Sequence, residues 1–460
     1  MTTALGGSFR DPSGFVFSEA GVIYRQVNRR YQAHYDQLMG GGLYEALVAT
    51  RWLISHDEVE RPASHDAHRT LRPERIPYIS YPYEWCFSQL KDAALLTLDI
   101  QRLALQFGMS LKDASAYNVQ FIGCRPVFID TLSFEAYSDG APWIAYRQFC
   151  QHFLAPLALM AHGDFRLRHL LRAYVDGVPL DLASRLLPTR TRLRPGLLAH
   201  IHLHAGSQRR HQADGRQQAA ATIPTLPKSR LLVLIENLRG AVSRCTLPRV
   251  ATEWGDYYQD TNYTAETMAA KEATVARMID EVSAPSALVH DLGANTGRFS
   301  RLVANPRRYV VSHDIDEMAV ERHYLANAGQ GVDHVLPLLL DLTNPSPSVG
   351  WALEERASMI DRASGSTVMA LALIHHLAIG NNVPLPAIAA LLARIARALV
   401  IEFVPKEDSQ VQRLLATRED IFPEYTQEGF ERAFSTCFEI VGRERLSGAA
   451  RTLFAMRRKG

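Results

Sequence analysis

The chain has few cysteines and lacks any segment suited to a membrane. Its 460 residues contain 5 cysteines, an odd number, and they lie scattered at Cys86, Cys124, Cys150, Cys245 and Cys437. Scattered cysteines in odd number are typical of a reducing compartment. No apolar run is long enough to cross a bilayer, and the N-terminal segment lacks the apolar core of a signal peptide. We therefore expect a cytoplasmic protein without a membrane span.

A strong excess of one charge is also absent. Lys and Arg number 50 against 48 for Asp and Glu, which leaves a formal net charge of +2. Proteins that bind nucleic acid through its phosphates usually carry a clear positive excess. A small-molecule partner is therefore favoured over nucleic acid.

The length exceeds that of one ordinary domain, and no internal repeat divides it. Hydrophobic periodicity is lost around a polar stretch that starts at Gly206. The sequence therefore predicts a separate α+β domain over residues 1–188, a basic flexible linker over 189–230, and a second domain over 231–460.

A glycine-punctuated turn follows a short apolar run in the second domain. The run ends at Asp291, and Gly293, Asn295 and Gly297 follow before a polar helix start. Glycines allow the backbone to bend and to approach a ligand without a Cβ in the way. In α/β proteins, a strand followed by such a turn and a helix typically forms the binding site of a nucleoside-type cofactor.

The elements that follow strengthen this interpretation. A second apolar run ends at Asp314, and Asp316 is placed to cap the next helix, predicted over 317–327. A third run, 334–341, ends at Asp341. Acids at these strand ends are suited to accept hydrogen bonds from ribose hydroxyls and from an adenine amino group.

Four further runs complete the predicted sheet, at 367–374, 398–404, 438–442 and 452–456. Apolar runs that alternate with amphipathic helices favour a mostly parallel, doubly wound sheet, whose ligands bind beyond the carboxyl ends of the strands. The last two runs are close enough in sequence to form an antiparallel pair.

On these residues, the second domain resembles the class I S-adenosylmethionine-dependent methyltransferases. Asp291 matches the acid of the family's first motif, Gly293 and Gly297 its outer glycines, and Asn295 replaces the middle glycine. Asp314 matches the acid of the second motif and Asp341 the acid on the adenine side. The resemblance implies a Rossmann-like seven-stranded sheet with an antiparallel terminal pair, and S-adenosyl-L-methionine as cofactor. It also implies that the amides around Gly293 face the amino-acid part of the cofactor.

The resemblance extends to the segment before the first strand, which in similar enzymes folds over the cofactor. Tyr257 would then cover the methionine end, and Lys271 would meet its carboxylate. The alternative is ordinary helix packing and a solvated lysine.

Two adjacent histidines follow the fourth run, where the family places residues on the substrate side. Transfer to oxygen or nitrogen often requires removal of a proton, and imidazole is suited to that role. His376 is our first candidate for the base and His375 the second; the alternative is a histidine held in the core. An Asp/Asn-Pro-Pro-Tyr/Phe motif and a cysteine are both missing here, which disfavours methylation of adenine amino groups and of cytosine carbon 5.

One segment of the first domain, 113–130, resembles the catalytic segment of protein-kinase-like and aminoglycoside-phosphotransferase-like folds. By that resemblance Asp113 is the base, and Asn118 and Asp130 hold magnesium. No histidine precedes Asp113 in the usual place and no lysine precedes Lys91, so Arg25 is the candidate to replace the phosphate-pairing lysine. An active phosphotransferase, a degenerate binding domain and coincidence remain open.

Three histidines lie at alternate positions, His200, His202 and His204, which would share one face of a strand. No cysteine or acid lies at ligand spacing, so we expect no metal.

The sequence thus predicts a methyltransferase that acts on an O or N nucleophile of a small molecule or biosynthetic intermediate. The two-part layout resembles class I methyltransferases of a NoeA-like, nodulation-associated group. The alternatives are an RNA or protein methyltransferase, a bifunctional kinase-methyltransferase, and a kinase-like binding protein whose methyltransferase fold is inert.

Overall fold

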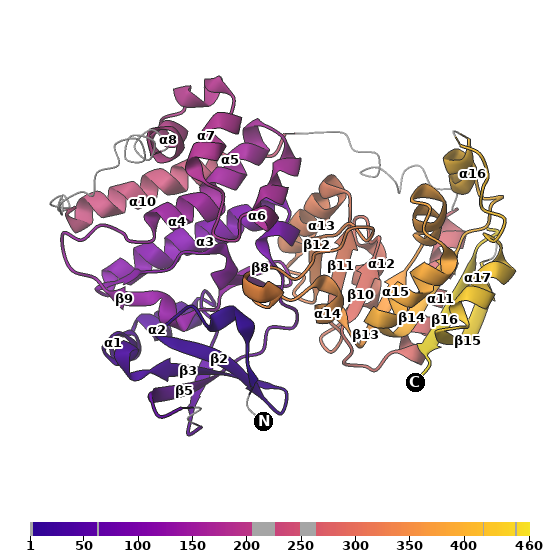
Figure 1. Cartoon of the computed structure of the whole chain (residues 1–460), viewed down its shortest axis with the longest axis horizontal. Coiled ribbons are helices and arrows are strands. Elements are labelled where there is room, and N and C mark those ends of the chain that lie inside the picture. The colour runs from indigo at the N-terminus through magenta and orange to yellow at the C-terminus, as the bar shows by residue number, and fades with distance from the viewer. Residues whose placement is uncertain (1–2, 62–63, 205–225, 249–263, 417, 447–448) are drawn as a thin grey trace. The chain divides into compact units, whose positions relative to one another are not determined.

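The computed structural model describes the chain except for residues 1–2, 62–63, 205–225, 249–263, 417 and 447–448 (Figure 1). It divides into two compact units. Unit 1 comprises Met1–Phe121, Arg125–Arg249 and Val349–Arg356, and unit 2 comprises Ile122–Cys124, Val250–Ser348 and Ala357–Gly460. Among the described residues, no helix has the length and apolar character needed to traverse a bilayer.

Unit 1 begins with an antiparallel sheet of order β1-β2-β3-β5-β4. The strands are β1 (Thr3–Ala4), β2 (Gly14–Glu19), β3 (Val22–Asn28), β4 (His56–Val59) and β5 (Ala67–Pro73). Helices α1 (Gln32–Gly40) and α2 (Leu43–Ala49) connect β3 to β4. Tyr31, Tyr35 and Leu71 form a small buried cluster with Val27 and Leu132, which ties the sheet to the segment Thr131–Ser133.

The rest of unit 1 is mainly helical (Figure 1). Its helices are α3 (Phe87–Gln106), α4 (Tyr146–Phe149), α5 (Ala155–His162), α6 (Leu170–Ala173), α7 (Leu180–Leu186), α8 (Pro195–Leu197) and α10 (Lys228–Ser243). Two small sheets pair β6 (Met109–Leu111) with β9 (Phe134–Ala136), and β7 (Val119–Ile122) with β8 (Arg125–Phe128).

The linker prediction does not match this arrangement. Residues from Thr189 form a 3-10 helix, α8 and a π-helix over Leu198–Leu203, and α10 also belongs to unit 1. His200 and His202 are therefore buried helical side chains and do not share a strand face. The ring of His202 forms hydrogen bonds with the hydroxyls of Ser184 and Thr191, which lie 18 and 11 positions earlier in the chain, so a local periodicity pattern does not reveal them. Of the predicted linker, 205–225 lies outside the described residues.

Unit 2 contains a seven-stranded sheet of order β12-β11-β10-β13-β14-β16-β15. The strands are β10 (Val289–Leu292), β11 (Val310–Asp314), β12 (Val335–Leu339), β13 (Ser366–Ala370), β14 (Ala396–Phe403), β15 (Phe438–Arg445) and β16 (Thr452–Arg458). The first five are parallel, while β16 runs antiparallel to β14 and to β15. The predicted antiparallel end of the chain is therefore present.

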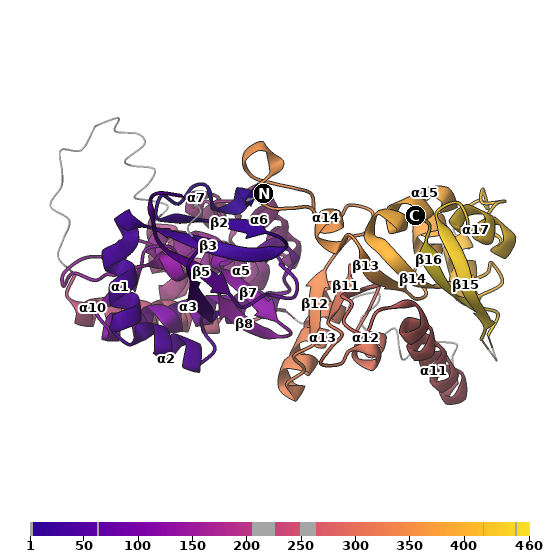
Figure 2. The same cartoon turned by 90° about the horizontal axis from the view of Figure 1, so that it is seen from below.

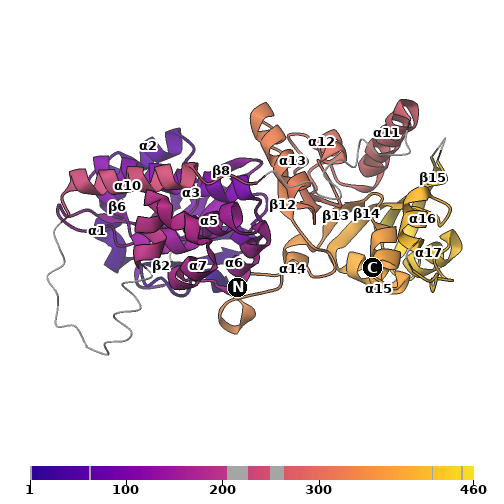
Figure 3. The ribbon, with the colours of Figure 1, turned by 90° about the horizontal axis from the view of Figure 1, so that it is seen from above.

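Helices cover both faces of this sheet. One face carries α11 (Ala265–Val282), α12 (Arg298–Val303) and α13 (Glu317–Gln330), and the other carries α14 (Met359–Ala363), α15 (Leu385–Ile395) and α17 (Gln427–Phe434) (Figures 2 and 3). A further helix, α16 (Ser409–Leu415), follows β14. Every residue of β12 and of β13 is buried, as expected for parallel strands covered on both sides.

The fourth strand is shorter than predicted. β13 ends at Ala370, because Ala372 takes a positive φ of 51° and Ile374 already belongs to a helical segment. His376 consequently begins a π-helix, His376–Gly380, directly beyond the strand end. Single π-helical turns of this kind are frequent at functional sites.

Candidate functional site

The turn between β10 and α12 depends on three residues with positive φ. These angles are 77° at Gly293, 49° at Asn295 and 75° at Gly297. A Cβ at Gly297 would lie 1.9 Å from the ring of His323, so this position has room only for glycine. The sequence pattern therefore reflects both backbone conformation and close packing against α13.

The carboxylate of Asp314 holds this turn at the tip of β11. Its Oδ2 accepts the Asn295 amide at 2.7 Å, and its Oδ1 accepts the Asp316 amide at 2.8 Å. Burial is the main reason that the pKa of Asp314 rises to about 6. Asp316 caps α13 by accepting the amides of Met318 and Ala319, as predicted.

The amides at the start of the turn have a different role from the one that the resemblance implied. The amides of Gly293 and Ala294 donate to the carbonyl of His313 at 2.8 and 2.9 Å. They therefore fasten the end of β10 to β11 and are not available to a ligand.

A cavity of about 430 Å³ lies beyond the carboxyl ends of the strands. We call it the strand-tip cavity. The predicted site residues that line it are Gly293, Asn295, Asp314, Asp341 and His376. Its volume falls in the usual range for small-molecule sites. Sequence reasoning missed Thr343 and Asn381, which also line it, because no motif marks them.

Asp341 lines this cavity from the end of β12. Its Oδ1 accepts both the amide of Thr343 at 2.8 Å and the Thr343 hydroxyl at 2.6 Å. No hydrogen bond to its Oδ2 is found among the described residues, so this oxygen can accept from a ligand.

Asp291 lies behind the cavity wall. Its side chain is buried and accepts the hydroxyl of Ser300 at 2.6 Å, while Ser312 donates to Ser300 at 2.8 Å. Burial raises the pKa of Asp291 to about 7. Through this hydrogen bond to Ser300, Asp291 fixes the first turn of α12 against the end of β10.

Lys271 does not line the cavity. Its ammonium lies 2.7 Å from Glu402, and Arg451 approaches the other oxygen of Glu402 at 3.8 Å. All three side chains are buried, and burial lowers the pKa of Lys271. Lys271 therefore forms part of an internal ion network, and no local pattern indicates its partner 131 positions away. Tyr257 lies outside the described residues.

The two histidines differ in exposure. His376 lines the cavity, and burial together with the charge of Arg451 lowers its pKa to about 4. His375 is 1% exposed, and neither of its ring nitrogens has a hydrogen-bond partner in the described part of the chain. His376 is therefore the imidazole that a ligand of this cavity meets.

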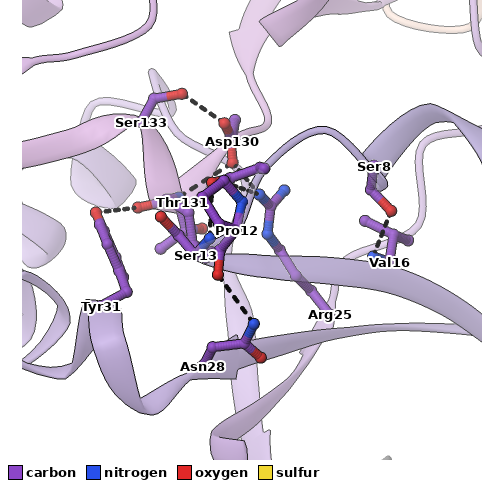
Figure 4. A network of polar contacts seen from close by, with 12 residues as sticks. Ser8, Pro12, Ser13, Val16, Arg25, Asn28, Tyr31, Asp130, Thr131 and Ser133 are labelled. Atoms are coloured by element: carbon purple, nitrogen blue, oxygen red, sulfur yellow. Dashed lines mark hydrogen bonds and ion pairs between the residues drawn. The ribbon is translucent and has the colours of Figure 1, made fainter. Parts of the chain in front are cut away.

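Unit 1 contains a cavity of about 500 Å³, which we call the unit 1 cavity. Asp113, Asn118, Asp130 and Arg25, the residues singled out in the first domain, all line it. The guanidinium of Arg25 reaches from β3 to Asp130 at 2.7 Å (Figure 4). Burial, followed by the charge of Asp130, raises the pKa of Asp113. Among the acids that line the cavity, Asp113 and Asp130 thus repel each other, which favours a nearby cation, and Arg25 already supplies one to Asp130.

No protein-family model matches the chain. The chain is 36% identical over 462 residues to the nodulation protein NoeA of Rhizobium meliloti (strain 1021), and the match covers 99% of this chain and 96% of that protein.

Among solved structures, the N-methyltransferase NodS of Bradyrhizobium japonicum WM9 with S-adenosyl-l-homocysteine is 11% identical, with a TM-score of 0.32, covering 46% of this chain and 94% of NodS. Magnesium protoporphyrin IX methyltransferase (ChlM) of Synechocystis PCC 6803 with bound SAH is 16% identical, with a TM-score of 0.30, covering 45% of this chain and 93% of that one. Likeness at these TM-scores carries no conclusion for this chain.

Proposed function

Because the chain belongs to the family of the nodulation protein NoeA, whose name specifies no reaction, we propose its activity from the strand-tip cavity. The activity is S-adenosylmethionine-dependent methyl transfer to an O or N nucleophile of a small molecule or biosynthetic intermediate. The observation that carries this proposal is the carboxylate of Asp314, which lines the cavity from the tip of β11 and fixes the neighbouring glycine turn.

The residues present fit this cofactor. Each oxygen of Asp314 accepts one backbone amide, which leaves further lone pairs for two ribose hydroxyls. In this proposal the carboxylate of Asp341 accepts a hydrogen bond from the adenine amino group, and Gly293, which has no Cβ, lets the nucleoside lie close to the backbone. We keep Tyr257 as the residue that covers the methionine end. Lys271 is assigned to the buried network with Glu402 that supports the site.

S-adenosylmethionine supplies a methyl group already activated on a sulfonium sulfur. The protein must align the nucleophile and accept its proton. His376 is neutral at neutral pH because its pKa is about 4, so its ring can accept a proton from the attacking group. The nearby charge of Arg451 disfavours the imidazolium, which promotes onward release of that proton.

Substitution His376→Ala tests the catalytic assignment. We expect methyl transfer to fall about 100-fold or more, as general-base contributions usually amount to roughly 10²–10⁴. Affinity for S-adenosylhomocysteine should stay within about twofold, since His376 is not assigned to its binding. Transfer is measured as label incorporated from methyl-labelled cofactor into small molecules of a cell extract.

The half-buried His334, outside the cavity, provides the control His334→Ala. Normal transfer by the His376→Ala variant would exclude this base. Absence of transfer by the wild-type protein, combined with tight cofactor binding, would favour the inert scaffold. Label in RNA or protein would favour the macromolecular alternative.

The unit 1 cavity supports a second candidate function, magnesium-dependent binding of a phosphate-bearing nucleotide. The observation that favours it is the convergence of Asp113, Asn118 and Asp130 with Arg25. Carboxylate and amide oxygens suit magnesium, and a guanidinium suits phosphate.

Substitution Asp130→Ala should abolish magnesium-ATP binding measured by calorimetry, since it removes a cation ligand and the partner of Arg25. Asp57→Ala, which removes an exposed carboxylate paired with Arg72 in the same unit, should bind as the wild type does. Equal affinity in both variants would refute the magnesium site.

We also propose a cytoplasmic location. All 5 cysteines are free thiols, which supports a reducing compartment.

A further inference from the structure

The strand-tip cavity extends along the edge of the unit 2 sheet. Asp314 and Asp341 line it from the ends of β11 and β12, while the segment after β13 and helix α16 line another part. Since β10 lies between β11 and β13, the tip of β13 is about 10 Å from that of β11 at the usual strand spacing. We call the wall beyond β13 and β14 the substrate end; it comprises Leu373, His376, Leu377, Gly380, Asn381 and Leu414.

Leucine side chains form the apolar part of the substrate end. Leu377 is buried, and Leu373 and Leu414 are half-buried. A ligand that covers these carbons with apolar surface removes both surfaces from water, and the stabilisation grows with the area covered. The wall therefore favours a methyl acceptor that has an apolar part.

The substrate end carries no charge near neutral pH in the part of the chain that the structure describes. Besides its leucines and Gly380 it contains Asn381 and His376, and burial together with the charge of Arg451 lowers the pKa of His376 to about 4. An ionised group that is buried without a counter-ion is costly. The charged side chains found along the rest of the described cavity wall, Asp314 and Asp341, are both acidic, so an anion is disfavoured further. An uncharged methyl acceptor is therefore favoured.

Asn381 supplies a hydrogen-bonding oxygen at the substrate end. Its Nδ2 donates to the carbonyl of His376 at 2.8 Å. A carbonyl oxygen only accepts, so this bond fixes which way the Asn381 amide faces and directs Oδ1 away from it. No hydrogen bond to that Oδ1 is found among the described residues, and Asn381 lines the cavity. Oδ1 can therefore accept from an O–H or N–H group of the methyl acceptor.

Both elements that form the substrate end are fixed within unit 2. Asp408 caps α16, and Arg451 pairs with its carboxylate at 2.7 Å. Arg418, which follows α16, donates to the carbonyls of Ile379 and Gly380 at the end of the π-helix. The π-helix and α16 are thus joined into one wall, which needs no ordering when the methyl acceptor binds.

We propose that the methyl acceptor is an uncharged, partly apolar compound with a second hydrogen-bond donor beside the reacting O–H or N–H group. This inference rests on the proposed methyl transfer at this cavity. Leu377 and Leu414 contact the apolar part, and Asn381 accepts from the second donor. His376 accepts the proton of the reacting group. Phosphorylated compounds and nucleic acids do not fit this end of the cavity.

The transfer step needs no further reactant. A lone pair of the reacting oxygen or nitrogen forms the bond to the methyl carbon, and the bond from that carbon to sulfur breaks with its electron pair left on sulfur. The O–H or N–H bond breaks as its proton moves to His376. Asn381 holds the second donor in place and exchanges no proton. The methylated product is therefore uncharged, like the compound from which it forms.

The charge and polarity of the product test this proposal. The full-length protein is incubated with methyl-labelled S-adenosylmethionine and the small molecules of a cell extract, and the labelled product is analysed by electrophoresis at neutral pH and by reversed-phase chromatography. We expect a product that does not migrate in electrophoresis and is retained on the reversed-phase column. A product that migrates as an anion or a cation, or is not retained, would overturn this inference and leave the proposed methyl transfer intact. No labelled product at all would overturn both.

Substitutions at Leu414 test the apolar wall. Leu414→Lys places a cation at the substrate end, so we expect formation of the same product to fall about 10-fold or more, while the affinity for S-adenosylhomocysteine stays within about twofold. Leu414→Met keeps an apolar side chain of similar volume and should retain transfer within about threefold. Leu325→Lys, on α13 at a position that is 53% exposed and outside the cavity, is the matched control. Transfer at the wild-type rate by the Leu414→Lys variant would overturn the assignment of this wall.

Substitution Asn381→Ala tests the polar contact. We expect the KM for the extract fraction that yields the product to rise about fivefold or more with little change in kcat, because a hydrogen bond to the methyl acceptor is lost. The pH profile of kcat, which follows His376, should stay as in the wild type. A shifted pH profile with unchanged KM would show that Asn381 acts only by holding the His376 backbone, and its contact with the methyl acceptor would then be wrong.

Discussion

Substitution Asp314→Ala should weaken the binding of S-adenosylhomocysteine by about 100-fold or more, because hydrogen bonds to a charged acceptor contribute roughly 1.5–3 kcal/mol each and two ribose hydroxyls would lose theirs. The substitution also deprives the Asn295 and Asp316 amides of their acceptor, which loosens the glycine turn. Titration calorimetry measures the effect directly. Affinity equal to that of the wild type would contradict the assignment of this cavity to the cofactor.

Two controls separate charge from geometry. Asp314→Asn keeps the size of the side chain and one oxygen acceptor, so its loss of affinity should be smaller. Asp333→Ala, at an exposed position outside the cavity, should bind normally.

The pH dependence of wild-type binding provides a further check. The pKa of Asp314 is about 6, so the carboxylate is ionised above that pH and becomes protonated below it. Affinity should therefore fall as the pH drops through about 6, and this part of the fall should be absent in Asp314→Asn.

The sheet of unit 2 was largely predictable because its strands are buried on both faces. Continuous apolar runs that end in an acid mark such strands at short range, and they located β10, β11 and β12 together with Asp314 and Asp341. Positive φ at Gly293 and Gly297 follows from the same local pattern. Site residues whose positions are set by a single strand and the turn after it could thus be predicted from the local sequence.

Contacts between segments far apart in the chain could not be predicted from the sequence. The pairing of Lys271 with Glu402 and the orientation of two adjacent histidines are decided by packing across the sheet. The membership of Val349–Arg356 in unit 1 is likewise a long-range property, since its own residues show only a turn. The linker prediction was wrong at both ends because helical segments that belong to unit 1 lie on either side of 205–225. The apolar residues of α10 recur at helical spacing, but that spacing does not show which unit the helix packs against.

Substitution Gly297→Ala should destabilise unit 2 by about 2–5 kcal/mol, the sum of roughly 1–2 kcal/mol for a residue with a Cβ at positive φ and roughly 1–3 kcal/mol for overpacking. The steric term arises because the new Cβ would overlap the ring of His323, which is 1% exposed and has no room to move away. The start of α12 would shift, and with it the support that Asp291 gives through Ser300. Denaturant unfolding followed by near-ultraviolet circular dichroism measures the loss, and calorimetry should show weaker binding of S-adenosylhomocysteine.

A double-mutant cycle with His323→Ala identifies the cause of that loss. Removing the ring costs stability by itself, but it also removes the atoms that a Cβ at position 297 would meet, so Gly297→Ala should be less damaging in the His323→Ala background. The remaining penalty should be close to the backbone strain of about 1–2 kcal/mol. The same penalty in both backgrounds would show that backbone conformation alone demands glycine here. A reduced penalty would show that α13 packs against the turn closely enough to set the position of the residues that follow β10, and hence the shape of the strand-tip cavity.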